Sequence, residues 1–550
     1  MPTFGYPYFN TNHGMKQIRL LLAVLCTGWL ACQEPLASSA EVQPVDTSVT
    51  IVNAFIPRFF DSARLYAFIA AERLNAQDSA AMLSFYHDRN YQYAWFDSSG
   101  FSLQAQLFAN LYSSYRESVA DSSLYVPAFD SLLRQLLPAE QAAAGTVWSA
   151  DEQVRAELLL TRHFFRYAER AYAANKQLNL RDLGWFIPKK KLDPRRFLDT
   201  LLASDSADVA GLLPVHPLFE SLRRQLARYL QLQATEPWPE IDFGKTTLQN
   251  GDSGMIAALQ HRLWVLGDLA AADTGAGWTD AATRALRQYQ QRMGLPPTGQ
   301  WGPATRQSLN EPLAVRIRQL RINMERARWV PRPGQGRYLV VNIPEFKLHA
   351  YDSGRHVFEM NVVVGKPATN TVVFNGQMRY VVFAPYWNVP YSIVKNEMGR
   401  SEAYFKRRNM EIVGRYADGL PMVRQKPGPG NSLGQVKFLF PNSYSIYLHD
   451  TPSKSLFGQN KRAFSHGCIR VADAPALAEW VLQRQPGFDE GRIRAAMDST
   501  AEWTVTVKDP IPVFIGYFTC WVDAAGLLQS RPDLYGHDEQ LATRLFGASK

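Results

Sequence analysis

The chain changes its periodicity at Pro331–Pro333, and this change limits the folds that are open to it. Before it, from about residue 54 to residue 232, apolar residues recur at steps of three and four, the spacing of an amphipathic helix. After it, from Tyr338 onward, runs of β-branched and aromatic residues are separated by turn residues, which is typical of strands. The sequence therefore predicts a multidomain α+β protein, with a helical N-terminal part followed by a mainly antiparallel β-domain.

Length and composition indicate a globular protein. With 550 residues, the chain has room for three or four domains. Hydrophobic residues make up 46% of the chain and aromatic residues 12%, which excludes an intrinsically disordered protein. The formal net charge of +9 is modest for this length, and nothing resembles a nucleic-acid-binding module, so we expect no nucleic acid partner.

The N-terminus is predicted to be a secretory signal. A basic start at residues 15–19 precedes an apolar run of 12 residues, 20–31, which is too short to span a bilayer as a helix. The run leads into Trp-Leu-Ala-Cys at residues 29–32, which resembles a lipoprotein cleavage box. Cys32 is therefore the predicted site of lipidation and the one expected link to a membrane. The alternative is cleavage after a nearby alanine, and both Met1 and Met15 are candidate start residues.

Cys468 and His449 are the strongest candidates for chemistry. His449 ends a short predicted strand, residues 445–449, from which its side chain can turn into a cleft. Gly467 lets the backbone turn tightly before Cys468, so that neighbouring N–H groups can converge. A thiol must lose its proton before it attacks a carbonyl, and a nearby imidazole is the usual base. We expect Cys468 to be the nucleophile and His449 its general base, whereas Cys520 lies in an apolar run and is expected to be inert.

The hexapeptide Ser-His-Gly-Cys-Ile-Arg at residues 465–470, with His449 upstream, resembles the signature of the YkuD-type catalytic domain of L,D-transpeptidases. More narrowly, the chain is similar to the large multidomain L,D-transpeptidases of Gram-negative envelopes. The resemblance covers most of residues 315–540. Its supporting stretches, in the order of the family, are Trp387-Asn388-Val389-Pro390, Gln-Lys-Pro-Gly-Pro-Gly-Asn at 425–431, Lys-Phe-Leu-Phe-Pro-Asn at 437–442 and His449-Asp450-Thr451-Pro452.

The resemblance implies an acyltransferase that joins peptidoglycan stem peptides without a cofactor or a metal ion. Cys468 would attack the carbonyl at stem position three of a tetrapeptide, release D-alanine and hold the acyl group as a thioester until an amine of a second stem takes it, giving a 3→3 cross-link. His449 would transfer the proton, and the backbone N–H groups of Gly467 and Cys468 would bind the oxyanion. The orienting partner of His449 is either a backbone carbonyl near Asp450 or the Asp450 carboxylate. Carbapenems, which acylate the cysteine of this family, are expected to react with Cys468.

Further residues are expected to contact the substrate. Tyr447 points the same way as His449 by strand alternation, and the fixed charge of Arg470 suits a substrate carboxylate. The remaining candidates are Trp387, Asn388, Ser465 and His466, of which the last two are expected mainly to shape the turn before the thiol.

The remaining segments are assigned partly from periodicity and partly from the resemblance. Residues 244–311 resemble the three-helix peptidoglycan-binding domain, which implies binding to glycan strands, although they could also act only as a spacer. The predicted organisation is a signal at 1–32, a tether at 33–50, a helical scaffold at 51–240, a peptidoglycan-binding-like domain at 241–312, a connecting helix at 313–336, and the catalytic domain at 337–550 with a helical and loop-like capping insertion at about 392–434.

The connecting helix is amphipathic, and its apolar side can be formed by Leu313, Ile317, Leu320, Met324 and Ala327. We expect this side to dock onto the globular domain that follows rather than onto a membrane, because prolines end the helix just before that domain.

Three other interpretations stay open. A zinc peptidase could use His449, Asp450 and His466 as ligands, although their spacing matches no common zinc motif. A non-enzymatic lipoprotein could bind the wall through residues 244–311. A related enzyme could pass the same acyl group to water or to a protein amine, which would make it an L,D-carboxypeptidase or an enzyme of lipoprotein attachment. All place the protein in the periplasm or cell envelope, with peptidoglycan as its partner.

Overall fold

The computed structural model describes residues 58–98, 100–119, 122–136, 148–205, 209–244, 248, 252–271, 277–399 and 401–547. The predicted signal, the tether and Cys32 lie outside these residues. No helix in the described ranges is long and apolar enough to cross a membrane.

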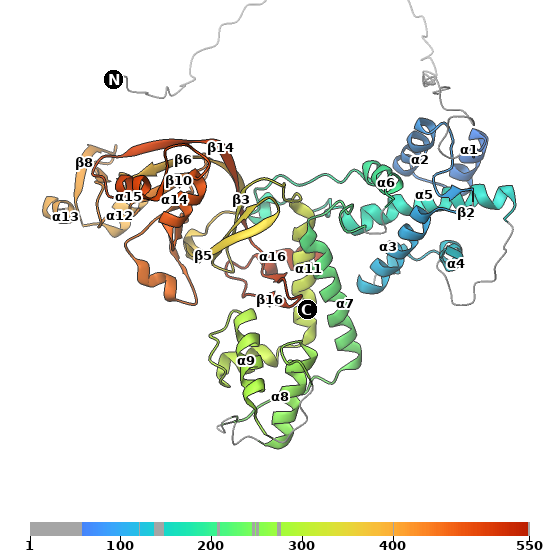
Figure 1. The fold of residues 1–550 in the computed structure, drawn as a ribbon, viewed down its shortest axis with the longest axis horizontal. Coiled ribbons are helices and arrows are strands. Elements are labelled where there is room, and N and C mark those ends of the chain that lie inside the picture. Colours follow the sequence, from blue (N-terminus) through green and yellow to red (C-terminus); the bar gives the residue numbers. More distant parts are fainter. Residues whose placement is uncertain are drawn as a thin grey trace, which may run out of the picture.

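The N-terminal part is helical, as predicted (Figure 1). The long helix α5 (Ala150–Tyr172) runs through it and begins with a capping box formed by Ser149 and Glu152. Its buried face includes Leu160, Phe164 and Tyr167, which are spaced by three and four residues. The elements around it are α1 (Ser62–Ala71), α2 (Ala76–Asp88), α3 (Leu103–Val119), α4 (Pro127–Leu136), α6 (Pro194–Leu202), α7 (Pro217–Thr235), the turns η1 (Ser122–Leu124) and η2 (Arg181–Leu183), and the hairpin of β1 (Phe96–Asp97) and β2 (Gly100–Phe101).

A small helical unit lies beyond the far end of α7 (Figure 1). It consists of α8 (Ser253–Val265), α9 (Asp280–Arg292) and α10 (Pro303–Leu309). The buried amide of Gln290 closes the loop between α9 and α10, since it donates to the carbonyl oxygen of Gln300 at 2.9 Å and accepts from the Gly299 N–H at 2.8 Å. These contacts fix the loop between α9 and α10 against α9.

The helix α11 (Leu313–Trp329) lies between the two apolar cores of the molecule. Its five predicted apolar residues pack into the core of the helical part, mostly against α7. On its other side, Ile322 and Trp329 pack into the core of the β-domain. The helix does dock onto the domain that follows, but not by the predicted side alone. That side packs mostly against α7, in a core that also includes Cys520 and Leu528, while Ile322 and Trp329 contact the core of the β-domain.

The β-domain is one large sheet that closes on itself. The strand order is β12-β5-β13-β11-β10-β6-β14-β3-β4, and β4 also pairs with β5. Most pairs are antiparallel, as predicted, but β14–β3, β11–β13 and β12–β5 are parallel. The strands are β3 (Tyr338–Asn342), β4 (Lys347–Asp352), β5 (Arg355–Gly365), β6 (Phe374–Phe383), β10 (Val436–Leu439), β11 (Leu448–His449), β12 (Ala463–Ser465), β13 (Ile469–Val471) and β14 (Trp503–Gly516).

Further elements surround this sheet, and the C-terminal ones return to α11 (Figure 1). Asn323 of α11 donates to Thr519 at 2.8 Å, and Arg326 forms an ion pair with Asp538 at the start of the last helix. These contacts fix the connecting helix to the end of the chain. The elements are η4 (Pro367–Thr369), η5 (Lys454–Gly458), α14 (Ala474–Leu482), α15 (Glu490–Met497), β15 (Cys520–Val522), β16 (Leu528–Ser530) and α16 (His537–Phe546).

The predicted capping insertion projects from the end of the β-domain that lies farthest from the helical part (Figure 1). It has its own small apolar cluster, which includes Val394, Phe405 and Val423. The stretch up to residue 434 was expected to be loop-like but forms a hairpin, whose turn contains Asp418 and Gly419 with a φ of 82°. The elements are β7 (Trp387–Asn388), α12 (Tyr391–Glu397), α13 (Glu402–Arg407), β8 (Met410–Arg415) and β9 (Pro421–Gln425), with the strands in the order β7-β9-β8.

Candidate active site

Two short parallel strands bring the predicted cysteine and histidine into one neighbourhood. In the β11–β13 pair, Leu448 is the register partner of Ile469, and His449 is the partner of Arg470. Leu448 and Ile469 are fully buried in the core. Because side chains alternate along a strand, the residues on either side of this pair project from the opposite face.

Four predicted site residues therefore share that opposite face, namely Tyr447, His449, Cys468 and Arg470. The rings of Tyr447 and His449 lie with their centroids 5.7 Å apart. Cys468 is half-buried, and its thiol donates to the carbonyl oxygen of Ser445 at 3.6 Å. The strand that carries His449 is shorter than predicted, because Ser445 adopts a φ of 55° and cannot belong to it.

The imidazole of His449 is oriented by the main chain. Its Nδ1 lies 2.5 Å from the carbonyl oxygen of Asp450, so Nδ1 carries the hydrogen and Nε2 keeps a lone pair for use as a base. The Asp450 carboxylate instead contacts Lys454 Nζ at 2.6 Å and accepts from the Gln435 N–H at 3.0 Å. Of the two orienting partners considered for His449, the structure has the backbone carbonyl.

Burial shifts the pKa values of the imidazole and of the thiol in the directions that favour their neutral forms. Burial, followed by the charge of Arg470, lowers the pKa of His449 to about 4. Burial raises the pKa of the Cys468 thiol, against the opposing effects of hydrogen bonds with Tyr447 and the charge of Arg470. A neutral pair of this kind suits general-base activation during attack rather than a preformed thiolate–imidazolium pair.

The turn before Cys468 is held by hydroxyl groups. Gly467 has a φ of 111°, which side chains other than that of glycine rarely allow. Ser465 Oγ donates to the carbonyl oxygen of Cys468 at 2.5 Å and accepts from the Gly467 N–H at 3.2 Å. Thr371 Oγ1 donates to the carbonyl oxygen of Gly467 at 2.8 Å, and Thr369 Oγ1 donates to that of Ser465 at 3.1 Å. Ser465 thus shapes the turn, and the Gly467 N–H is engaged within it.

Arg470 offers an unused donor on the face that carries the cysteine. Its guanidinium is half-buried, and Nε is enclosed without a hydrogen-bond partner among the described residues. Burial lowers the pKa of Arg470, an effect that Cys468 opposes. An enclosed donor without a partner is costly, and the charge of the half-buried guanidinium suits an anionic ligand on this face.

The other predicted substrate residues lie in or near the cap. Trp387 packs against the apolar cluster of the cap, and Asn388 is exposed beside it. Both belong to β7, which pairs with β9. His466, in contrast, leaves the catalytic turn and contacts Glu397 of α12 through Nε2 at 2.6 Å. His466 thus links the turn to the cap.

Three residues that contact the turn before Cys468 were not predicted from the sequence. Thr369 and Thr371 come almost a hundred residues before the turn they support, and Glu397 lies in the cap. Isolated threonine or glutamate residues carry no sequence signal of such a role, because the contact exists only after the sheet has formed.

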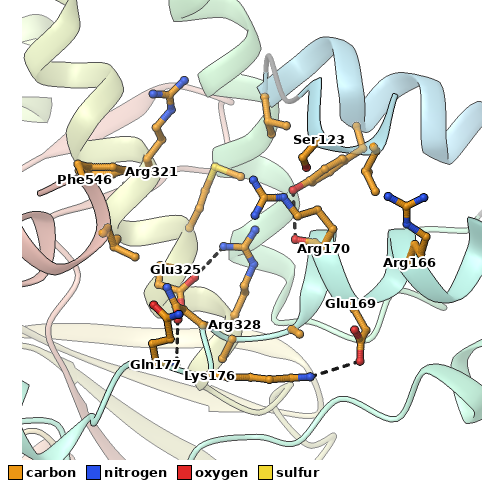
Figure 2. Close-up of a pocket in the computed structure, with 18 of the residues that line it drawn as sticks. Ser123, Arg166, Glu169, Arg170, Lys176, Gln177, Arg321, Glu325, Arg328 and Phe546 are labelled. Carbon is orange, nitrogen blue, oxygen red and sulfur yellow. Dashed lines mark hydrogen bonds and ion pairs between the residues drawn. The ribbon is translucent and has the colours of Figure 1, made fainter. Parts of the chain in front are cut away.

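A large cavity of about 950 Å³ lies elsewhere, at the junction of α5, α11 and α16 (Figure 2). None of the predicted site residues lines it. Of its acidic groups, Glu169 pairs with Lys176 at 3.5 Å and Glu325 with Arg328 at 2.8 Å. Size makes a cavity a candidate ligand site, but this one lacks a nucleophile beside a base and so does not fit the predicted chemistry. Its basic lining comprises Arg166, Arg170, Lys176, Arg321 and Arg328.

Comparison with known families agrees with this geometry. Residues 336–513 match the model of the L,D-transpeptidase catalytic domain, YkuD. The chain carries a YkuD catalytic domain. Residues 80–226 match the Scaffold domain, and residues 252–309 match the model named "Putative peptidoglycan binding domain". The resemblance drawn from residues 465–470 is confirmed, as is the mixed helical and β-rich fold.

Individual relatives of this chain are distant or partial. A protein named "Putative L,D-transpeptidase" from Haemophilus influenzae is 32% identical over 242 residues, which are 40% of this chain and 48% of that protein. The chain thus spans about half the length of this curated relative. An L,D-transpeptidase from Mycobacterium smegmatis is 15% identical with a TM-score of 0.19, covering 34% of this chain and 60% of its own. One from Stackebrandtia nassauensis is 14% identical with a TM-score of 0.21, covering 51% and 97%.

Proposed function

We propose that this chain is a cysteine L,D-transpeptidase that forms 3→3 cross-links between peptidoglycan stem peptides. The observation that supports this most is the shared face of the β11–β13 pair, where Cys468, His449, Tyr447 and Arg470 project together. It combines a thiol, a base with a fixed tautomer and a cation for the substrate on two short strands.

In the first half of the reaction, Nε2 of His449 takes the thiol proton while the sulfur of Cys468 attacks the carbonyl carbon at stem position three. The N–H of Cys468 binds the oxyanion, and the Gly467 N–H joins it by turning from Ser465 Oγ. Collapse of the tetrahedral intermediate breaks the peptide bond, and His449 returns the proton to the amine of the departing D-alanine. Each oxyanion donor contributes about 2.7–4 kcal/mol to lowering the barrier.

In the second half, the thioester reacts with the side-chain amine of another stem. His449 removes a proton from the amine, the new amide bond forms, and the Cys468 sulfur leaves and regains its proton. Thiol esters suit this exchange because the energy of the original peptide bond is conserved, and no nucleotide is consumed. Arg470 attracts a carboxylate of the donor stem through the charge of its half-buried guanidinium.

The remaining domains would deliver the enzyme to its polymer. The domain at residues 252–309 binds glycan strands, and the helical scaffold presents it to the catalytic domain. We place the protein in the periplasm, held at the outer membrane through a lipid on Cys32, whose segment lies outside the described residues.

Incubation of the purified protein with disaccharide-tetrapeptide, with the products analysed by mass spectrometry, tests this function. Cross-linked dimer and free D-alanine are expected, with no product from Cys468→Ala and nearly normal turnover by Cys520→Ser, whose thiol is fully buried. Tripeptide without dimer would indicate an L,D-carboxypeptidase. An unchanged substrate, together with binding to intact wall, would indicate a non-enzymatic wall-binding protein. Turnover that survives Cys468→Ala and requires zinc would indicate a metallopeptidase.

A carbapenem provides a second test that does not depend on the acceptor. One covalent adduct is expected, and peptide mapping should place it on Cys468. An adduct on Cys520, or none, would contradict the assignment of the nucleophile.

A further inference from the structure

The β4–β5 hairpin carries a convergent set of metal-binding atoms that the active site does not use. His349 Nδ1 lies 3.3 Å from His356 Nε2 and 3.4 Å from Glu359 Oε2. All three atoms lie within 4.8 Å of one another, and no second such group of histidine, cysteine or acidic residues occurs in the described part of the chain. The set therefore differs from the scattered acidic residues of an ordinary surface.

A β-bulge brings these side chains together. His349 and Glu359 are register partners in the antiparallel pair. The register then shifts by one residue, so that Tyr351 pairs with His356. Without the shift, strand alternation would aim His356 at the opposite face. With it, the two imidazole rings lie on one face, with their centroids 5.5 Å apart.

A buried carboxylate orients the central imidazole. His349 Nε2 lies 3.0 Å from Oε2 of Glu345, whose side chain is only 8% exposed. Because the carboxylate accepts, Nε2 carries the hydrogen, and the Nδ1 lone pair faces His356 and Glu359. A carboxylate behind a histidine in this way is the usual outer-sphere partner of a metal-binding histidine. A lone pair opposite a carboxylate oxygen is unfavourable by itself, and a cation between the two atoms relieves the repulsion.

We propose that His349 Nδ1, His356 Nε2 and Glu359 Oε2 bind a divalent transition-metal ion of the zinc class, with water completing the coordination. Two imidazoles and one carboxylate suit Zn²⁺ and its neighbours, whereas Ca²⁺ and Mg²⁺ prefer oxygen ligands alone. Lys347 forms an ion pair with the other oxygen of Glu359, Oε1, which leaves Oε2 for the metal. His356 and Glu359 are exposed, so the ion has a path from solvent.

The bound ion would act on the closure of the sheet, not on the reaction. The β4–β5 pairing closes the sheet on itself. Further along β5, Val362 and Val363 pair with β13, the strand that follows Cys468. A metal bound by His349, His356 and Glu359 thus holds β4 and β5 together, and β5 in turn pairs with β13. Because the ion binds only the folded domain, it stabilises that domain by mass action.

Zinc titration by calorimetry at neutral pH tests the site. The protein should be the full chain without a histidine tag, in a Cys468→Ala background that removes the catalytic thiol as a competing ligand. One equivalent of Zn²⁺ is expected to bind and to raise the melting temperature. Adding His356→Gln or Glu359→Gln should weaken binding at least ten-fold and remove the rise, and both residues are exposed, so their replacement leaves the fold intact.

His466→Gln in the same background is the matched control, because it removes another histidine that lies beside a glutamate. It should bind zinc as tightly as its parent. The absence of a one-equivalent site in the parent, unchanged binding in His356→Gln, or an equal loss in His466→Gln would overturn the proposal. If a proton rather than a metal lies between His349 and Glu359, the parent will show no one-equivalent zinc site.

Discussion

Nδ1 of His449 lies 2.5 Å from the main-chain carbonyl oxygen of Asp450, the next residue in the chain. The carboxylate of the same aspartate faces away, toward Lys454 and the Gln435 N–H. The tautomer of the proposed base therefore depends on the backbone, and substitution of the Asp450 side chain does not remove its partner.

Two substitutions test whether the backbone carbonyl or the side chain of Asp450 orients His449. Asp450→Asn should lower kcat/KM by less than about ten-fold, because the asparagine oxygen still accepts from Gln435 and the carbonyl partner of His449 is unchanged. A carboxylate that orients a catalytic histidine costs about 10⁴-fold when it becomes an amide. His449→Gln, which removes the base itself, is the comparison and should lose at least about 10³-fold. A loss near 10⁴-fold in Asp450→Asn at an unchanged melting temperature would contradict the backbone assignment.

The pH dependence of the reaction follows from the environment of His449. Nε2 accepts a proton only in the neutral ring, and burial together with Arg470 lowers the pKa of His449 to about 4. Activity should therefore persist as the pH falls through 6.5, the ordinary value for histidine, and decline only near pH 4. Removing the charge in Arg470→Gln should raise the pKa of His449 and move this decline to higher pH.

The measurement is kcat/KM against pH in both proteins, over the range in which circular dichroism shows them folded. Lys347→Gln is a control, since it removes a partly exposed cation of the β4–β5 hairpin. A wild-type decline centred between pH 6 and 7, or a decline that Arg470→Gln leaves in place, would contradict the proposed control of the base.

Gly467 gives a prediction about the turn. A methyl group there would lie 3.6 Å from the nearest atom, the carbonyl oxygen of Asn370, so space is available. The cost comes from the backbone, because a residue with a Cβ atom adopts a φ of 111° only at a free-energy cost of about 1–3 kcal/mol. Gly467→Ala should therefore lower the melting temperature and, by shifting the neighbouring thiol, lower kcat at least about ten-fold.

Gly491 in α15 is the matched control, because its Cβ position is also open and its φ is not in the left-handed region. Gly491→Ala should leave kcat unchanged and raise stability by about 0.5–1 kcal/mol. Equal effects of the two substitutions would show that the conformation of Gly467 is unimportant.

The sequence predicted the elements better than their pairing. The period of three and four residues found α5 and the apolar side of α11, because burial on one face leaves that pattern in any helix. The parallel pairing of β11 with β13 left no such mark. Each strand has two or three residues, and their alignment depends on the whole closed sheet. The sequence could name Cys468 and His449 but not the register that puts Arg470 opposite His449.

The same limit explains the residues that were missed. The hairpin of β8 and β9 was visible in Asp418-Gly419, a common hairpin turn, but the glycines and prolines that follow it suggested a loop. The set of His349, His356 and Glu359 was not visible at all. Its spacing matches no metal motif, and only a one-residue bulge places His356 on the right face.

The contact between His466 and Glu397 yields a prediction about the fate of the thioester. It is a hydrogen-bonding contact between the catalytic turn and the cap, and both side chains are partly exposed, so Glu397→Gln should change the free energy of unfolding by less than about 1 kcal/mol. The cap should open more often, and water should reach the acyl group before the second stem does. The ratio of tripeptide to cross-linked dimer, read by mass spectrometry, should rise at least about two-fold.

Glu411→Gln is the control, since Glu411 pairs with Arg424 inside the cap and does not reach the turn. A product ratio that stays the same in Glu397→Gln, or rises equally in Glu411→Gln, would show that this contact does not hold the cap over the intermediate.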